Sequence, residues 1–211
     1  MIPGINPKSI PAIIWDLDKR FPDKVYKPAR GVFRVRKFVE DQNQPAPTPP
    51  VSVPVPARIE ERAFYEAVAD YLMKELEECT KAIPLGGNRF RDKWGTPDVI
   101  GVLKASPTDV LKFSEQIVSA EIKVDSADLI TAFGQACAYK LFSHRSYIVV
   151  PRNSPAEDIA RLDALCLIFG IGLILFDASN ISAPDFQIRA RAVRHEPDMF
   201  YVNKNIPDDV R

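Results

Sequence analysis

Hydrophobic and polar positions recur with two different periods along the chain, and these periods predict its helices and strands. Between Ile59 and Cys79, large apolar side chains recur at intervals of three and four residues, which is the pattern of an amphipathic helix. Between Ile117 and Asp125, apolar and polar residues alternate, as in a strand with two different faces. We expect a helix to cover its apolar row of Val118, Ala120, Ile122 and Val124. The other face is left with Ser119, Glu121 and Lys123.

Further strands are predicted on both sides of this segment. Residues 97–103 are apolar after Asp98, so this carboxylate stands where a buried strand begins. Residues 147–151 and 171–176 are short apolar runs, typical of parallel core strands. Residues 186–192 alternate apolar side chains with Gln and Arg, which favours a late edge strand with a basic face. Strands alternating with helices indicate an α/β domain.

Two more helices are predicted between the later strands. The first begins at Ser126 as the N-cap and runs to about Ser143. The second begins with a capping box, Ser154-x-x-Glu157, has Pro155 at its first helical position and ends at Gly170. The main apolar stripe of the first helix is Leu129, Ile130, Phe133, Ala136, Cys137 and Leu141, and that of the second is Ile159, Leu162, Leu165, Cys166 and Phe169.

Two carboxylates and a lysine in these strands suggest phosphodiester chemistry. If the two strands are neighbours, Asp98 and Glu121 can hold one hard cation through oxygen atoms, which suits Mg²⁺ or Mn²⁺ better than zinc. Such an ion stabilises charge on a phosphate and lowers the pKa of a water molecule, while Lys123 orients that water or stabilises the transition state. Each motif alone is short enough to occur by chance, so their order along the chain carries the argument.

In that order, Pro97-Asp98 followed by Glu121-Ile122-Lys123, the chain resembles the PD-(D/E)xK nuclease superfamily, the fold of many restriction endonucleases and Holliday-junction resolvases. The resemblance covers roughly residues 58 to 176. It implies a restriction-endonuclease-like central mixed sheet flanked by helices. It also implies a metal-dependent endonuclease acting on DNA, with Asp98 and Glu121 as metal ligands and Lys123 as a catalytic residue. The alternative is a protein of nuclease fold that binds nucleic acid or a partner without cleavage.

Two auxiliary residues follow from the same resemblance. Family members often carry a glutamate on the first helix, which matches Glu61 on the apolar stripe, whereas Glu66 falls on the solvated face. A first-turn acid favoured by the helix dipole is the competing interpretation of Glu61. Gln135 and Tyr139 form a Gln-x3-Tyr pair similar to one in several branches of the superfamily, and by resemblance Gln135 could orient the lysine or a phosphate. For Tyr139, an ordinary residue of a buried helix is the favoured interpretation.

Cations mixed with aromatic side chains just before Asp98 are the best candidates for contact with nucleic acid. This segment follows Gly86-Gly87, which suggests a mobile turn, and its candidate residues are Arg89, Arg91, Lys93 and Trp94. His144 and His195 are isolated, and His144 is better explained by favourable interaction with a helix dipole than by catalysis.

Composition divides the 211 residues into three parts. A proline-rich spacer at 45–56 separates a small N-terminal α/β appendage, residues 1–44, from the nuclease-like domain at 57–211. In the appendage, an apolar stripe from Ile10 to Leu17 predicts a short helix, and residues 31–39 predict a strand with a basic face. Residues 1–56 carry nine Lys or Arg against five Asp or Glu, a net charge of +4 in a chain that is neutral overall, and this basic part could face phosphates.

The remaining composition limits partners and location. The three cysteines are far apart and odd in number, which argues against disulfides and zinc and favours small core residues on predicted helices. There is no membrane-length apolar run or basic-then-apolar leader, so we expect a cytoplasmic protein without a membrane partner. DNA is the expected partner and a homodimer would suit double-strand cutting. No organic cofactor is expected, because the chain has neither a phosphate-binding glycine loop nor a nucleophile-base pair, which also argues against a small-molecule enzyme.

Overall fold

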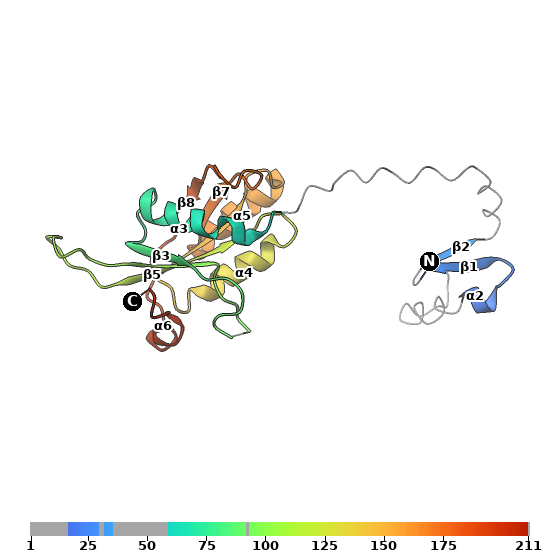
Figure 1. Ribbon diagram of the computed structural model, residues 1–211, viewed down its shortest axis with the longest axis horizontal. Helices are drawn as coiled ribbons and strands as arrows, with labels where there is room; N and C mark the ends of the chain where they lie inside the picture. Colours follow the sequence, from blue (N-terminus) through green and yellow to red (C-terminus); the bar gives the residue numbers. More distant parts are fainter. Residues whose placement is uncertain (1–16, 30–31, 36–58, 92, 211) are drawn as a thin grey trace. The chain divides into compact units, whose positions relative to one another are not determined.

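The computed structural model describes residues 17–29, 32–35, 59–91 and 93–210, and the chain divides into two compact units, Met1–Ala57 and Arg58–Arg211 (Figure 1). The described elements of the first unit are helix α2 (Leu17–Arg20) and the antiparallel strands β1 (Val25–Ala29) and β2 (Val32–Val35). Strand β2 corresponds to part of the strand predicted at 31–39, and β1 was not predicted. The predicted stripe at 10–16 and the spacer at 45–56 lie outside the described residues.

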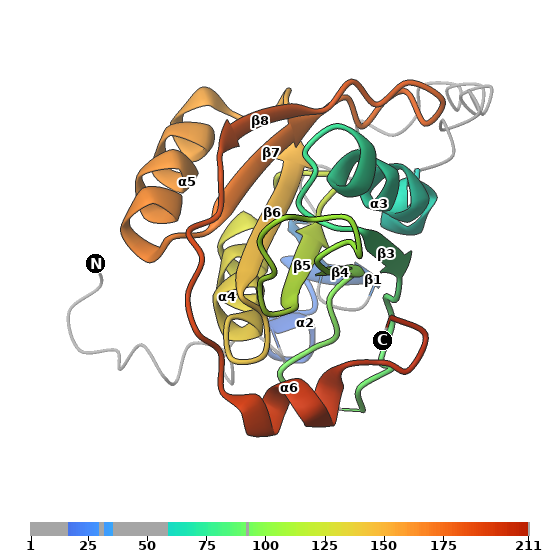
Figure 2. The same ribbon diagram turned by 90° about the vertical axis from the view of Figure 1, so that its left-hand side faces the viewer.

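A six-stranded mixed sheet forms the centre of the second unit, with the strand order β3-β4-β5-β6-β7-β8 (Figure 2). Strands β5, β6 and β7 run parallel to one another, and the other three pairs are antiparallel. The strands are β3 (Lys81–Pro84), β4 (Val99–Leu103), β5 (Gln116–Ile122), β6 (Arg145–Pro151), β7 (Gly172–Phe176) and β8 (Gln187–Ala190). The predicted α/β class, a mixed sheet flanked by helices, is confirmed.

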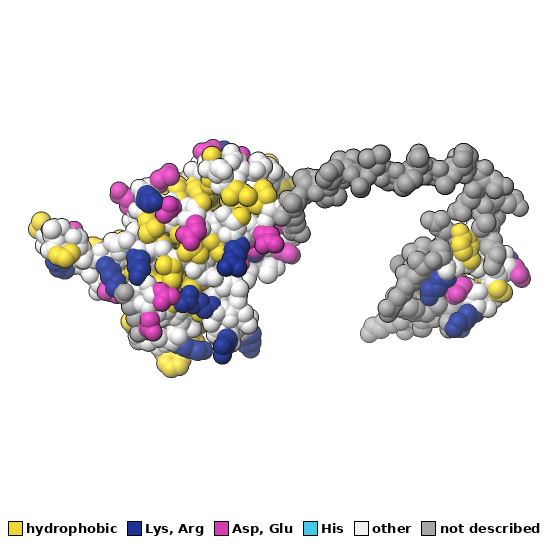
Figure 3. All heavy atoms as spheres, in the orientation of Figure 1, with side chains coloured by type: hydrophobic (Ala, Val, Ile, Leu, Met, Phe, Trp, Pro, Cys, Tyr) yellow, Lys and Arg dark blue, Asp and Glu magenta, His cyan; other side chains and the backbone are white. Residues whose placement is uncertain are grey.

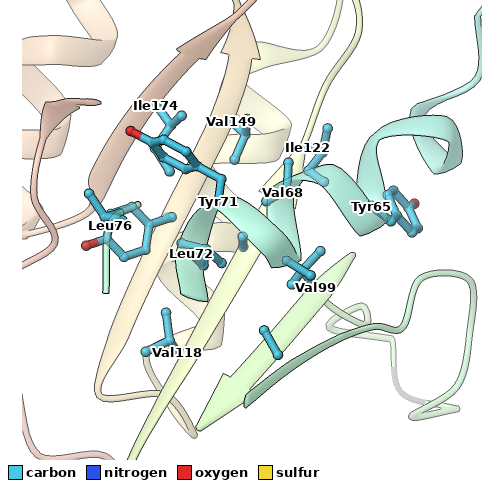
Figure 4. Packing of buried hydrophobic residues seen from close by; sticks show 14 of the residues in the cluster. Tyr65, Val68, Tyr71, Leu72, Leu76, Val99, Val118, Ile122, Val149 and Ile174 are labelled. Atoms are coloured by element: carbon cyan, nitrogen blue, oxygen red, sulfur yellow. The ribbon is translucent and has the colours of Figure 1, made fainter. Parts of the chain in front are cut away.

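One face of the sheet packs against a 3₁₀ turn, η4 (Glu61–Phe64), and the helix α3 (Tyr65–Lys74) that continues from it. The apolar row predicted for β5 lies on this face, with Val118, Ala120 and Ile122 fully buried. Figure 4 shows side chains of α3, such as Val68 and Leu72, directed onto the sheet. The helix forms because its apolar stripe finds this row, as the sequence pattern predicted.

The opposite face packs against α4 (Leu129–Tyr139) and α5 (Ala156–Phe169). Leu129, Phe133 and Ala136 are buried as predicted, but Ile130 and Leu141, assigned to the same stripe, are exposed. A last helix, α6 (Met199–Asn205), contributes Val202 to a third cluster that includes Tyr139 and Phe142. The polar face of β5 is therefore also covered, and its charged residue Glu121 is buried.

Four helix boundaries differ from the predictions, one of them the end of α4, which is Tyr139 and not about Ser143. The first helix ends at Lys74, so Cys79 lies between α3 and β3 and not on a helix. Helix α4 begins after Asp128, and Ser126 does not cap it. Helix α5 begins after Pro155 without a side-chain cap, so the predicted capping box is wrong: Glu157 pairs with Arg161 one turn along the helix, and the buried hydroxyl of Ser154 has no hydrogen-bond partner. The predicted C-terminus is correct, since Gly170 is left-handed with φ 66°.

The two edges of the sheet differ in how well the sequence predicted them. Strand β3, which pairs with β4, was missed, because four residues ending in proline give little periodic signal. Strand β8 is the predicted late edge strand, and the basic side chains in and just after it are engaged: Arg189 bonds to Asp163, and Arg191, the next residue after β8, bonds to Glu78 at 2.9 Å. The basic face of β8 is thus part of the packing of the unit.

The connection between β4 and β5, residues 104–115, projects beyond the sheet (Figure 1). Its tip carries Val110 and Leu111, which are 96% and 81% exposed. Figure 3 shows hydrophobic side chains at this projecting tip. The tip lies at the end of the two strands that is opposite to Asp98 and Lys123.

The three cysteines are free thiols, and one of the two histidines is buried. Cys79 and Cys166 are buried and Cys137 is half-buried, as expected for small core residues. His144 is buried and its Nδ1 accepts a hydrogen bond from the Ile117 backbone at 2.9 Å, so the helix-dipole explanation is wrong. Burial lowers its pKa.

No described helix has the length and apolar character needed to cross a membrane.

Candidate active site

Asp98 and Glu121 lie side by side because of the register between β4 and β5. Val99 faces Ala120 in this antiparallel pair, and the Asp98 backbone donates to Ala120 at 3.0 Å, so the next pair along is Asp98 opposite Glu121. Opposite residues point to the same face of a sheet with their Cβ atoms about 4.5–5.5 Å apart. Both side chains are buried, with exposures of 6% and 3%. Two carboxyl groups therefore share a buried site.

The electrostatics of the pair follow from this burial. Burial and the neighbouring Asp98 carboxylate raise the pKa of Glu121 to about 7. Burial also raises the pKa of Asp98, although hydrogen bonds from Tyr65 and from the Ile122 backbone act in the opposite direction. Facing like charges destabilise a sheet, so this arrangement costs folding free energy unless a cation offsets it.

Lys123 supplies one positive charge next to the pair. Its backbone donates to Val149 at 2.9 Å, which continues the ladder beyond β5 and keeps its side chain on the face of Glu121. Its Nζ lies 3.2 Å from Glu121 Oε1 and 3.2 Å from Glu61 Oε1. Burial lowers the pKa of Lys123 while these carboxylates raise it, and the net direction is upward. The lysine is therefore held as an ammonium between the carboxylates of Glu61 and Glu121.

Glu61 reaches the site from η4, just before α3. A carboxylate on an apolar helix stripe needs a partner, and Lys123 donates a hydrogen bond to Glu61 here. The competing acid Glu66 is exposed, as expected. A cavity of about 410 Å³, lined by Ile59, Glu60, Glu61 and Val124, opens beside this contact.

Two tyrosines hold the carboxylates, and the sequence analysis assigned a role to neither. Tyr65 of α3 donates its hydroxyl to Asp98 Oδ1, and Tyr139 of α4 donates to Glu121 Oε2 at 2.7 Å. Burial and the adjacent carboxylates raise the pKa of both phenols, so both remain donors. The available signals were weak: Tyr65 is four residues after Glu61, and Tyr139 is four after Gln135, positions that are equally typical of a helix core.

Gln135 lies near this site but not on Lys123. The backbone at Gly95 passes close to it: a Cβ built on Gly95 would lie 3.4 Å from Gln135 Nε2 and 3.2 Å from Tyr139 Oη. Gly95 adopts φ +90°, a conformation that also favours glycine. The side chain of Gln135, on α4, therefore lies next to the loop that leads to Asp98.

That loop carries the four residues predicted to contact nucleic acid. Arg91 and Lys93 are exposed, and Trp94 is 64% exposed with Lys93 Nζ 5.6 Å from its ring centroid. Arg89 instead forms an ion pair with Asp209 at 2.7 Å. Gly86 and Gly87, before these residues, both have positive φ, which is consistent with the predicted turn.

The carboxylates of the site fit a metal ion only in part. In the part of the chain that the structure describes, no group of three or more His, Cys, Asp and Glu side chains is placed to hold one. Asp98 and Glu121 nevertheless fit a hard cation in part, because each carboxylate oxygen retains a lone pair beyond the hydrogen bonds above. Mg²⁺ commonly takes one or two carboxylates and completes its shell with water and phosphate oxygens.

Comparisons with protein-family models, with curated proteins and with solved structures gave no match. The interpretation of the site therefore depends on its own geometry.

Proposed function

We propose that the protein is a Mg²⁺- or Mn²⁺-dependent endonuclease that hydrolyses phosphodiester bonds in DNA, with a restriction-endonuclease-like fold of the PD-(D/E)xK type. The observation that carries the proposal is the buried pair Asp98 and Glu121, placed opposite each other with the Lys123 ammonium 3.2 Å from Glu121. A structural ion pair needs one acid and one base, whereas here a second buried carboxylate, Asp98, lies opposite the acid that pairs with Lys123. A cytoplasmic location and a homodimer, for cutting both strands, belong to the same proposal.

The roles of the residues follow from their contacts. Asp98 and Glu121 would hold the ion, which when bound supplies charge stabilisation on the phosphate and a more acidic water. Lys123 is a donor with three N–H groups, so it would orient the attacking water or stabilise charge on the phosphate. Glu61 positions the lysine, and Tyr65 and Tyr139 fix the rotamers of the carboxylates. Gln135, near Tyr139, is placed to support this arrangement through the loop at Gly95.

Cleavage assays on a panel of nucleic acids test this function. Linear, nicked, branched and single-stranded DNA, and RNA, are incubated with the protein and Mg²⁺ or Mn²⁺, with EDTA as the metal-free reference. We expect Lys123→Ala to lose activity by about 10²-fold or more, the scale for removing one transition-state donor. Lys74→Ala is the matched control, because Lys74 is an exposed lysine paired with Asp70 on α3.

The outcomes distinguish a nuclease from a nucleic-acid-binding protein that does not cut. Cleavage that requires the ion and Lys123 supports the nuclease. If no substrate is cut, or if Lys123→Ala cuts as well as Lys74→Ala, the catalytic assignment fails. Tight binding of DNA without cleavage would instead support the alternative of a non-cutting binding protein.

A further inference from the structure

A cavity of about 490 Å³ lies beside the candidate active site, between the end of α4, the loop before β4 and the segment around α6. Figure 2 shows α6 below the end of α4. This volume falls in the range of pockets that enclose small organic ligands, roughly 300–1,000 Å³. Its lining is mainly apolar and aromatic, with Phe90, Trp94, Tyr139, Phe142 and Tyr201 among the rings. The polar and charged residues of the lining are Lys140, His195, Glu196, Asp198 and Asn205.

One side chain joins the pocket to the carboxylate pair. Tyr139 lines the pocket, and its hydroxyl donates to Glu121 Oε2 at 2.7 Å. Gly95 also lines the pocket and approaches the same hydroxyl closely. A ligand group in the pocket is therefore separated from the candidate metal ligands by a single tyrosine.

The aromatic side chains are arranged as a fixed wall with an exposed ring at the opening. Phe90 packs edge-on against Phe142, with ring centroids 5.6 Å apart, and its backbone donates to Thr96 Oγ1 at 3.0 Å. Trp94 lines the same pocket but exposes 64% of its surface, which places the indole at the opening. Exposed aromatic rings beside cations are the platforms on which unpaired bases stack.

The charges around the opening favour a polyanion. Arg91 and Lys93 precede Trp94 in the sequence and are exposed. The acidic side chains of the lining are already engaged: Asp198 caps α6 by accepting from the Phe200 backbone at 2.8 Å, and Glu196 pairs with Arg194. The cations are thus available to phosphates on either side of a group held in the pocket.

We propose that this pocket receives one unpaired nucleobase of DNA, which stacks on Trp94 while an adjoining phosphodiester lies at Asp98 and Glu121. The inference rests on the proposed function, because it names the part of the substrate that the same site binds. A base inside a continuous duplex is not accessible to such a pocket, so the substrate class is single-stranded or locally opened DNA.

Binding to oligonucleotides with one abasic position tests the pocket without relying on cleavage. The affinity of the full chain for single-stranded DNA is measured in EDTA, with an abasic site moved along the strand. We expect one position at which loss of the base weakens binding by about 5- to 150-fold, and an equal loss from Trp94→Ala on the intact strand. Applied together, the two changes are expected to weaken binding no further, because they remove the same contact.

Control variants keep the test informative. Phe200→Ala removes an aromatic ring of similar exposure, 69%, that does not line the pocket, and it is expected to bind normally. Ala138→Trp fills the pocket from α4 and is expected to reproduce the loss, whereas Thr131→Trp, exposed on the same helix, is not.

The inference is overturned if the effects of Trp94→Ala and of the abasic site multiply at every position, or if no single-stranded DNA binds. Failure of the proposed function gives a different result. Base-dependent binding without ion-dependent cleavage would support the nucleobase pocket and contradict the nuclease activity.

Discussion

At the scale of single residues, the two facing carboxylates make a prediction about stability. Asp98→Asn retains an acceptor for the Ile122 backbone and can donate to Tyr65, and it removes a like charge opposite Glu121. We expect the metal-free variant to be more stable by about 1 kcal/mol, or roughly 2–4 °C in Tm at pH 8. Calorimetry with and without Mg²⁺ checks this. Two outcomes would contradict the assignment of Asp98 as a ligand. One is a metal-free variant with a lower Tm than the wild-type protein, and the other is a variant whose Tm rises with Mg²⁺ as much as that of the wild-type protein.

The tyrosine on α4 gives a second prediction at this scale. Tyr139→Phe removes the hydroxyl that fixes Glu121 but preserves the buried ring. We expect cleavage or Mg²⁺ affinity to fall by about 10- to 100-fold, as for other groups that orient metal ligands. Tyr71→Phe is the matched control, because Tyr71 lies on α3 and packs against Phe186, away from the carboxylates. Equal activity of the two variants would show that Tyr139 contributes only to packing of the hydrophobic core and not to the orientation of Glu121.

His144 gives a prediction about pH. Burial lowers its pKa in the folded protein, against an opposing effect of Glu196 and with support from Arg194, His195 and Arg145. The folded state then binds the proton less readily than the unfolded chain, so its contribution to stability is present above the ordinary value of 6.5 and is lost as pH falls below it.

Relative to His144→Gln, which retains an acceptor for Ile117, the wild-type protein should therefore lose stability between pH 7.5 and 5.5. The difference in unfolding free energy should change by less than about 1.4 kcal/mol per pH unit, the limit for one proton. Urea unfolding of both proteins across this range measures it, and parallel pH profiles would contradict the expectation.

The sequence predicted the charged part of the candidate site better than its neutral part. Asp98, Glu121 and Lys123 were identified from two short motifs on strands expected to be neighbours, and Glu61 from its place on the apolar stripe of the first helix. Tyr65 and Tyr139 were not, because a tyrosine on an apolar stripe gives the same pattern whether or not its hydroxyl reaches a carboxylate. Only the packing of both helices on the sheet brings the hydroxyls to the site.

At the scale of elements, replacing either of two glycines by alanine is expected to change the stability of the fold in opposite directions. A Cβ on Gly172 in β7 would lie 2.1 Å from the ring of Tyr147, whereas one on Gly134 in α4 would meet nothing within 4 Å. We expect Gly172→Ala to destabilise the fold by about 1–3 kcal/mol and Gly134→Ala to stabilise it by about 0.5–1 kcal/mol. Denaturant unfolding of both variants checks this, and stabilisation by Gly172→Ala would mean that Tyr147 can move aside.

The elements themselves show why some boundaries were predictable. Gly170 ends α5 as predicted, since a left-handed residue at this position satisfies the last carbonyls of the helix. The caps at Ser126 and Ser154 failed, because a capping motif competes with the path of the incoming chain from β5 or β6. Strand β3 was missed because its pairing with β4, rather than its own sequence, makes it a strand.

At the scale of the whole molecule, the charge of the first unit predicts the salt dependence of DNA binding. Residues 1–57 carry a net charge of +4, since Ala57 adds none to the count for 1–56. If they contact phosphates, their removal should reduce the slope of log affinity against log salt by up to about 4. Binding titrations from low to physiological salt with the whole chain and with residues 58–211 measure this. An unchanged slope would indicate that the basic residues are only a solvated surface.

The burial of sulfur makes the surface of this protein convenient for chemical labelling. Burial raises the pKa of both Cys79 and Cys166 to about 12 and also raises that of Cys137, so few thiolates are present at neutral pH. A cysteine introduced by Val110→Cys, at the projecting tip, would react with a maleimide dye far faster than the native thiols. The protein could thus carry one fluorophore on the strand pair that holds Asp98 and Glu121, at the end away from them.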